Sequence, residues 1–395
     1  MKVPIIMKWT FVGVFSASIL SGCDTKDESS LGSTKSDVVV QDIATVELKP
    51  ANAVLAAKFT KVTSVRELST GRILITDEAE NQIVLADFRM DNTATIGRQG
   101  RGPEEYYQVG MLWPLRGDSS LMYDQQLRRW LLFNGSRIVG PVAPDDDAVR
   151  ATRGYKLYGA DAEHVVARIY PWRRGVRVPD PGNVVRVRRS DGQSETIAQL
   201  APYDQGKPFI LVPIDGAAPS PNPVYHMSLI VNDQVMHFPD GWTAIARYNP
   251  YRVDWCPPDD ECMTGPVLET PRPLSDDDKR AHLAVAEEML DWPHTSDLSR
   301  TREDSWPKLI PPFIEPIFAM GGTTLFPLRD GRLLIERFPM GVPQWTYDVV
   351  DRRGVIVGRL TLPRGERIVA IGKSAIYTVA RDEFNLQELR RHPWP

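Results

Sequence analysis

The chain has 395 residues, 42% of them apolar and 25% charged, a balance typical of a globular protein rather than a disordered one. Its 33 prolines and 28 glycines interrupt long helices, which argues against a helical bundle or a helical solenoid. The formal net charge of −4 argues against nucleic-acid binding, which needs a strongly basic surface.

The first 22 residues have the pattern of a signal peptide. Lys2 and Lys8 precede an uncharged, mostly apolar stretch over residues 9–23, shorter than the ~20 residues that cross a bilayer. The tetrad Leu-Ser-Gly-Cys at residues 20–23 resembles the lipobox of bacterial lipoproteins, in which the cysteine is lipidated and becomes the N-terminus. We therefore expect lipid attachment at Cys23. The alternative is a plain secretory signal with an incidental cysteine.

The expected mature protein is anchored in the bacterial cell envelope and faces the periplasm. Residues 23–37 are rich in Ser, Lys, Asp and Glu, and so predict a flexible tether before a folded domain over residues 38–393. Asp24 resembles the inner-membrane retention signal of enteric lipoproteins, a rule that is not general among bacteria. The choice between inner and outer membrane stays open.

Cys256 and Cys262 are the two cysteines that remain after lipidation. They flank Pro-Pro-Asp-Asp-Glu, a turn-forming acidic insert, in a chain that is exported to an oxidising compartment. This favours a disulfide that closes a small loop. Two thiols without a nearby histidine pair make a poor zinc site.

Short β-branched segments alternate with turn residues after residue 38. The first unit has expected strands at 72–77, 82–88 and 93–98, and the second unit has them at 119–124, 129–133 and 137–142. Asp77 and Asp124 end equivalent strands 47 residues apart, and Phe88 and Phe133 lie 45 residues apart. A repeat of this period, with about four strands, is the spacing of a β-propeller blade.

Four further units complete a predicted all-β, six-bladed β-propeller. Their expected strands are 163–170, 183–188 and 195–200; 242–247, 251–255 and one near Val267; 331–336, 345–350 and 355–361; and 367–371, 375–380 and 386–391. The sixth unit lacks one strand. We expect Val38 to Leu48 to supply it, because closing the ring removes an open sheet edge.

One helix interrupts the strands, in an insertion at about 270–318 between blades four and five. Ser275 is a suitable N-cap, and the apolar residues Leu283, Ala286 and Leu290 follow at helical spacing. Aromatic residues and prolines in the rest of the insertion favour an ordered cap over a flexible linker. We expect this cap to cover one mouth of the channel and to contribute to the recognition surface; the alternative is a cap that only stabilises the fold.

Several motifs resemble those of bacterial six-bladed β-propeller lipoproteins related to NHL-repeat proteins. They are the lipobox, Gly-Arg-Ile-Leu-Ile-Thr-Asp at 71–77, Ile-Gly-Arg-Gln-Gly-Arg-Gly-Pro-Glu-Glu-Tyr at 96–106, and the segment at 347–360. The second motif departs from the family's Gly-Pro-Gly-Glu-Phe, with Glu104 for the glycine and Tyr106 for the phenylalanine. The resemblance implies a fold and a compartment more than a function.

Few residues suggest chemistry. The glycine-rich segment 97–102 lacks the following helix of a phosphate loop and is better interpreted as a crossover between blades. The acidic runs 145–147, 259–261 and 276–278 lack the alternation of a calcium loop and predict solvated loops and a helix cap. Asp77, Asp124, Glu163 and Glu336 could hold a metal at the central channel, although strand-end acids also serve as turn formers.

We therefore expect a binding or scaffold module that presents a propeller surface to a periplasmic or envelope protein, or to a glycan. It would need no cofactor and would not bind nucleic acid. The alternative is a metal-dependent hydrolase or lyase, similar to a sugar lactonase, with calcium at the central channel. The sequence does not name the ligand or substrate.

Overall fold

The computed structural model describes residues 43–142, 155–169, 182–201, 209–210, 225–226, 232–270, 272–281, 306, 308–310, 312–313, 323–337 and 344–394. All of them belong to one compact unit, Val40–Pro395, which is separate from Met1–Val39. The expected signal peptide, Cys23 and the tether lie outside the described residues. No helix in the described part of the chain is long and apolar enough to span a membrane.

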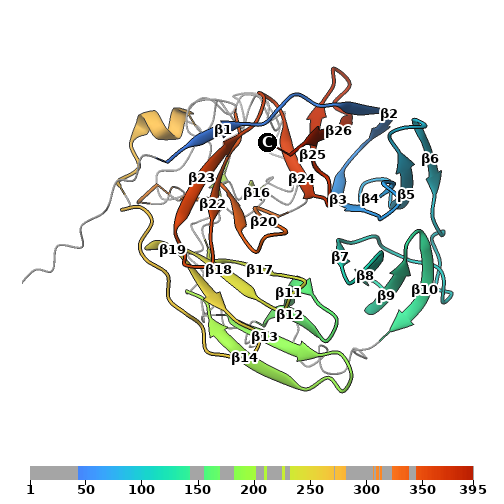
Figure 1. Cartoon of the computed structure of the whole chain (residues 1–395), viewed down its shortest axis with the longest axis horizontal. Helices are drawn as coiled ribbons and strands as arrows, with labels where there is room; N and C mark the ends of the chain where they lie inside the picture. Colours follow the sequence, from blue (N-terminus) through green and yellow to red (C-terminus); the bar gives the residue numbers. More distant parts are fainter. Residues whose placement is uncertain are drawn as a thin grey trace, which may run out of the picture. The chain divides into compact units, whose positions relative to one another are not determined.

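Six sheets, antiparallel except for one edge pair in blade five, surround a common centre (Figure 1). Blades one and two contain β3 (Val62–Glu67), β4 (Ile73–Asp77), β5 (Gln82–Asp87) and β6 (Asn92–Thr95), then β7 (Leu112–Pro114), β8 (Ser119–Asp124), β9 (Arg129–Asn134) and β10 (Arg137–Val142). Blades three and four contain β11 (Tyr155–Ala160), β12 (His164–Ile169), β13 (Asn183–Arg188) and β14 (Ser194–Gln199), then β17 (Gln234–His237), β18 (Thr243–Tyr248) and β19 (Tyr251–Cys256). Blades five and six contain β20 (Leu325–Pro327), β21 (Leu333–Glu336), β22 (Thr346–Val350) and β23 (Ile356–Thr361), then β24 (Arg367–Ile371), β25 (Ala375–Arg381) and β26 (Gln387–Pro393). A separate pair, β15 (Phe209–Ile210) and β16 (Tyr225–His226), lies in the connection between blades three and four.

The first strands of the six sheets form the inner ring. β3 contacts β7, β7 contacts β11, β11 contacts β17, β17 contacts β20, β20 contacts β24, and β24 returns to β3. The core lies between successive sheets, as where Tyr106 packs with residues of blades one and two. The predicted six-bladed propeller is confirmed.

The N-terminal segment closes the ring, but not with the residues expected. β2 (Ala53–Phe59) pairs antiparallel with β26 and completes blade six, whereas β1 (Thr45–Glu47) pairs parallel with β23 as a fifth strand of blade five. The prediction that Val38 to Leu48 completes the last blade is therefore wrong. Burial explains the difference, because Leu55 and Phe59 of β2 pack into the core between blades six and one while every residue of β1 is exposed.

A five-residue turn recurs between the first two strands of several blades. In blades one and five, Leu68 N donates to Arg72 O and Leu328 N donates to Arg332 O. Each turn has a glycine with a left-handed backbone, with φ of 80° at Gly71 and 85° at Gly331. Only glycine adopts this conformation without strain, which explains why the motif repeats.

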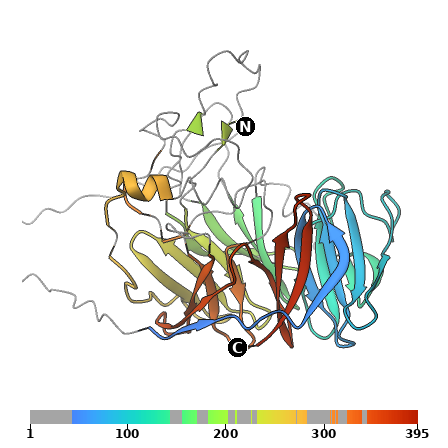
Figure 2. The same cartoon turned by 90° about the horizontal axis from the view of Figure 1, so that it is seen from above.

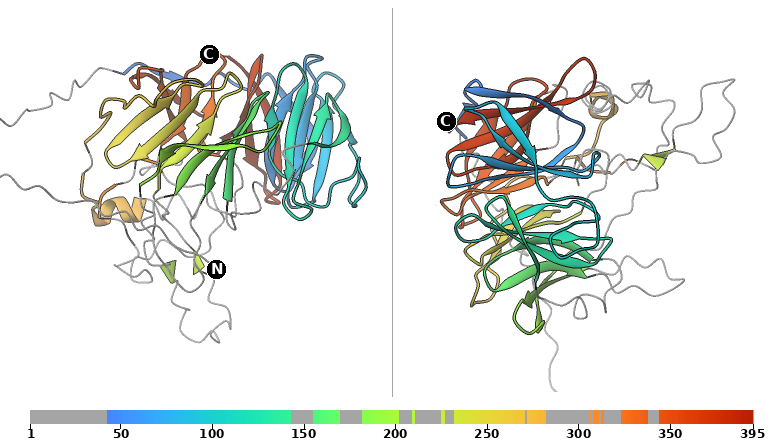
Figure 3. Two further views of the ribbon diagram at one scale, coloured as in Figure 1. Left: turned by 90° about the horizontal axis from the view of Figure 1, so that it is seen from below. Right: turned by 90° about the vertical axis from the view of Figure 1, so that its right-hand side faces the viewer.

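The helix between blades four and five covers residues 276–281 in the described part of the chain. Ser275 caps it as expected, since Asp278 N donates to Ser275 Oγ at 3.2 Å and Ser275 N donates to Asp278 Oδ2 at 2.9 Å. The helix lies on the side of the ring opposite the C-terminus (Figures 2 and 3). The predicted continuation to Leu290 lies outside the described residues.

Candidate functional site

Asp77 and Asp124, two of the predicted channel acids, hold the turns of their blades. Both are fully buried. The carboxylate of Asp77 accepts hydrogen bonds from Thr60 N at 2.8 Å and Lys61 N at 3.0 Å, and Asp124 Oδ2 accepts one from Tyr107 N at 2.7 Å. Each aspartate thus ties the segment that enters a blade to the end of that blade's second strand.

The other two candidates lie in different surroundings. Glu163 is exposed in the turn between the first two strands of blade three, at the opposite end of the blade from the position of Asp77. Glu336 is buried and its carboxylate accepts hydrogen bonds from Tyr347 Oη at 2.9 Å and from Arg367 Nε at 3.0 Å. It joins blade five to blade six.

These four acids do not form one site. Asp77, Asp124 and Glu336 end second strands, whereas the first strands form the inner ring. Their oxygens already accept hydrogen bonds from the protein. Across the described ranges, no three His, Cys, Asp or Glu side chains come together as possible metal ligands.

The glycine-rich crossover holds a carboxylate of its own. Glu105 Oε2 accepts a hydrogen bond from Gly102 N at 2.7 Å, and Glu105 Oε1 accepts one from Arg98 Nε at 2.6 Å. The backbone bond from Gly102 and the bond from Arg98 hold the pKa of Glu105 below its usual value. The loop therefore binds an internal anion where a phosphate loop would bind an external one.

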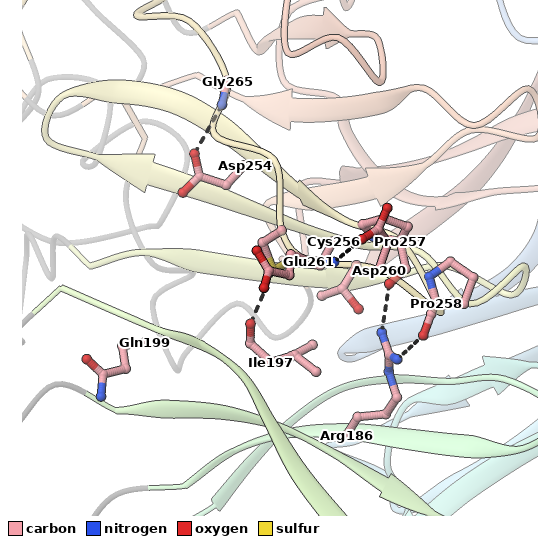
Figure 4. Close-up of a disulfide and its surroundings, with 12 residues drawn as sticks. Arg186, Ile197, Gln199, Asp254, Cys256, Pro257, Pro258, Asp260, Glu261 and Gly265 are labelled. Carbon is pink, nitrogen blue, oxygen red and sulfur yellow. Dashed lines mark hydrogen bonds between the residues drawn. A yellow bond between two sulfur atoms is a disulfide. The ribbon is translucent and has the colours of Figure 1, made fainter.

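Cys256 and Cys262 form a disulfide that closes the loop after β19 (Figure 4). Arg186 of blade three donates to the carbonyl oxygens of Pro257 and Pro258 in this loop. Cys262 Sγ lies 3.2 Å from the carbonyl oxygen of Ile197, also in blade three. The closed loop thus fastens blade four to blade three.

A pocket of about 520 Å³ lies at the seam between blades five and six. Its lining is Glu47, Leu48, Pro50, Ala51, Val54, Gln344, Thr361, Leu362, Pro363, Glu366 and Arg390. The first four belong to the segment 45–52, which we call the strap; it includes β1 and leads across the seam to β2. We call this cavity the seam pocket. Its volume lies within the range of small-molecule sites, roughly 300 to 1,000 Å³.

The strap is bonded to both blades. Leu48 N donates to Thr361 O of blade five at 2.8 Å, and Asn52 N donates to Arg391 O of blade six at 2.8 Å. A third bond joins Lys49 O to the Nδ1 of His392 at 2.8 Å. The strap therefore forms one wall of the seam pocket and is held by these bonds and by the pairing of β1 with β23.

Glu366 contributes the buried charge of the seam pocket. Its Oε1 accepts a hydrogen bond from Arg390 Nη1 at 2.8 Å, and its Oε2 lies 2.7 Å from Thr378 Oγ1 and 2.9 Å from His392 Nε2. Burial opposes ionisation of Glu366, but the hydrogen bonds from His392, Thr378 and Arg390 outweigh it and lower the pKa of this carboxyl. Glu366 is thus an ionised group that is already paired.

Two groups of the lining can still accept hydrogen bonds. Gln344 donates its amide nitrogen to Leu362 O at 2.8 Å, and its Oε1 has no partner in the described part of the chain. Glu47 is exposed and forms no ion pair with the described residues. The lining of the seam pocket therefore combines apolar residues, such as Leu48, Leu362 and Pro363, with the acceptor groups of Gln344 and Glu47.

The sequence analysis missed this pocket. Its lining comes from residues 47–54 and from residues 344–390, which lie about 300 residues apart in the chain. The local sequence signal for this pocket is the strand-like segment Val38 to Leu48, which the sequence analysis placed in blade six.

No protein-family model and no curated protein matches the chain. Among solved structures, it is similar to a member of the DUF4221 family from Bacteroides vulgatus (10% identity, 87% of this chain and 97% of that chain, TM-score 0.48). It is also similar to an exported protein from Bacteroides fragilis (10% identity, 89% and 94%, TM-score 0.45) and to the calcium-binding protein regucalcin from Agrobacterium tumefaciens (7% identity, 89% and 97%, TM-score 0.43). The likeness is to bacterial six-bladed propellers, and it concerns the fold alone.

Proposed function

We propose that the chain is a lipid-anchored, extracytoplasmic binding module that holds a small, mainly apolar ligand in the seam pocket. The observation that carries the proposal is a cavity of ligand size with apolar walls and a few polar groups at defined positions. The acceptors Gln344 Oε1 and Glu47 favour a ligand that carries one hydrogen-bond donor. An apolar body with an N–H or O–H group meets these requirements.

The proposed location rests on the sequence and on one structural feature. The lipobox at residues 20–23 supports lipid attachment at Cys23, and an oxidising compartment agrees with the disulfide between Cys256 and Cys262. A flexible tether over residues 23–37 would connect the lipid to the strap. The recognition of an envelope protein or a glycan by the insertion at 270–318 remains a separate hypothesis, because most of that insertion lies outside the described residues.

The hydrolase alternative receives no support from the residues predicted for it. Asp77 and Asp124 direct their carboxylates to backbone N–H groups, and Glu163 lies at the other end of its blade. The binding module is therefore the function that we propose.

A fluorescent probe tests the proposal. N-phenyl-1-naphthylamine is uncharged, apolar and carries one N–H group, and its fluorescence rises when it leaves water. We expect saturable binding to the purified protein. Ala51→Trp, which fills the pocket, should abolish it, while the matched control Ala94→Trp on exposed β6 should not. Equal binding by both variants would overturn the proposal.

A further inference from the structure

A row of short turns crosses four blades on one side of the ring. Each turn joins the first and second strands of its blade, in blades five, six, one and two. Arg329 Nη1 of blade five donates to Lys373 O of blade six at 3.2 Å, and Ser374 N donates at 3.0 Å to the carboxylate that ends β3 of blade one. Ser69 N donates to Asp118 Oδ1 of blade two at 2.7 Å. Because β26 ends beside the turn of blade six, the row lies on the side that carries the C-terminus (Figure 2).

Unpaired cations gather in this row. The turns cover residues 68–72, 115–119, 328–332 and 371–375. Their charged residues are Arg72, Arg116, Arg329, Arg332, Lys373, Asp118 and Asp330. Arg332 pairs with Asp330 at 2.6 Å, and Asp118 accepts hydrogen bonds from Ser69. The other four cations form no ion pair with the residues that the structure describes. We call Arg72, Arg116, Arg329 and Lys373 the basic sector.

The positive charge is confined to one half of this side. The equivalent turns of blades three and four contain Asp161, Glu163 and Asp240, and no lysine or arginine. At the opposite end of the blades, cations such as Arg98 are paired, in this case with Glu105 at 2.6 Å. The chain has a formal net charge of −4, so the basic sector is a local feature of an acidic protein. Its potential attracts an anionic partner.

The described chain begins beside the same half of the ring. β1 lies on the outer edge of blade five, and Lys49 Nζ of the strap lies 3.5 Å from Trp394 O, near the C-terminus. Twenty residues separate the expected lipid at Cys23 from Ile43, the first described residue. A segment of that length reaches up to roughly 70 Å, which lets either side of the ring face the membrane. Surface charge therefore decides which side does.

We propose that the side of the ring with the basic sector docks on an anionic membrane surface. Lysine and arginine side chains are attracted to anionic phospholipids at short range. Met90, in the turn between β5 and β6 at the same end of blade one, is 70% exposed and offers an apolar side chain to the headgroup region. The acidic turns of blades three and four then lie farther from the lipid. This inference goes beyond the seam pocket and rests on the proposed lipid anchor only for its place in the cell.

Vesicle sedimentation tests the docking with the unlipidated mature chain, which begins at residue 23 and carries Cys23→Ser. We expect binding to vesicles of equal parts phosphatidylcholine and phosphatidylglycerol, and none to phosphatidylcholine alone. Binding should weaken as salt rises, because the Debye length is only about 10 Å at 0.1 M salt. The double variant Arg116→Gln, Lys373→Gln should weaken it about 25-fold, at about fivefold for each charge that is removed near the surface.

A second double variant, Arg101→Gln, Arg381→Gln, is the matched control. It removes the same charge from exposed residues at the opposite end of the blades, so binding should change by less than about twofold. Both double variants should still bind N-phenyl-1-naphthylamine without vesicles, which shows that they are folded.

Three results would overturn the docking: equal binding to both kinds of vesicle, equal weakening by the two double variants, or capture of the acidic polysaccharide polygalacturonate by a chain that does not bind vesicles. The proposed function is tested apart from it. Sector-dependent vesicle binding by a wild-type chain that never binds the naphthylamine probe would support the docking and contradict the proposed ligand site instead.

Discussion

Asp161 and His237 join blades three and four through a hydrogen bond of 3.0 Å between Oδ2 and Nε2. Asp161 lies in the turn after β11, and His237 ends β17, the innermost strand of the next blade. The same carboxylate accepts hydrogen bonds from Glu163 N and His164 N, both at 2.6 Å. One buried acid thus organises a turn and fixes the neighbouring blade.

This acid gives the fold a dependence on acidic pH. Burial opposes ionisation of Asp161, but the bonds from His237 and the turn amides lower its pKa to about 2. Because the folded-state pKa lies below the unfolded value of 3.8, the stabilisation is present above about pH 4 and is lost as the pH falls toward 2. We expect Asp161→Asn to lower the free energy of unfolding by about 2 kcal/mol at pH 7 and by much less near pH 2. Urea unfolding at several pH values measures it, and an equal loss at both extremes would contradict it.

The aspartates at the ends of the second strands are structural in this account. Asp77→Ala removes the buried acceptor of two backbone hydrogen bonds and should destabilise the protein by about 2–3 kcal/mol. Asp124→Ala should behave in the same way. The matched control is exposed Glu163→Gln, which should change stability by less than about 0.5 kcal/mol. Probe binding at saturation should survive in all three variants, and its loss in Asp77→Ala alone would indicate a functional role.

Two substitutions, one in β2 and one in β1, compare the contributions of these strands to ring closure. Phe59→Ala empties a buried position of the last blade and should lower the free energy of unfolding by about 3–4 kcal/mol. Val46→Ala changes an exposed side chain of β1, which is 47% accessible, and should have little effect. Similar losses in the two variants would mean that β1 also belongs to the closure.

The disulfide should stabilise the junction of blades three and four. The double variant Cys256→Ser, Cys262→Ser opens a short loop, which should lower the free energy of unfolding by about 2 kcal/mol. The same loss should follow when the wild-type chain is reduced, and the double variant should then be insensitive to reductant. If reductant still lowers the free energy of unfolding of the double variant, the loss in the wild-type chain does not come from this disulfide.

The strands that the sequence predicted correctly are the second and third strands of all six blades, together with β6, β10, β14, β23 and β24. The second and third strands of all six blades, such as β4, β8 and β25, have clear alternation or long apolar runs. The innermost strands of blades one to five were all missed. β7 and β20 have three residues each, and β3 buries Thr63 and Ser64 as well as valines. A short strand that is buried on both faces leaves no alternating pattern in the sequence.

The candidate site was harder to predict for a different reason. Asp77 and Asp124 were found from their spacing, but the partners of their carboxylates are backbone groups, which a sequence does not display. Tyr106 packs between blades one and two, whereas its neighbour Tyr107 is 40% exposed. The seam pocket depends on how residues 47–54 cross the last two blades. That path depends on which strand closes the ring, and the periodicity of the sequence alone did not identify this strand.

The central claim, that the seam pocket binds a ligand, is tested most directly by methyl NMR during titration with N-phenyl-1-naphthylamine. We expect the methyl signals of Leu48 and Leu362 to shift together and saturate, while those of Leu131, buried in blade two, stay in place. In Ala51→Trp the shifts should disappear. Saturable probe binding with no change at Leu48 and Leu362 would place the ligand outside the seam pocket.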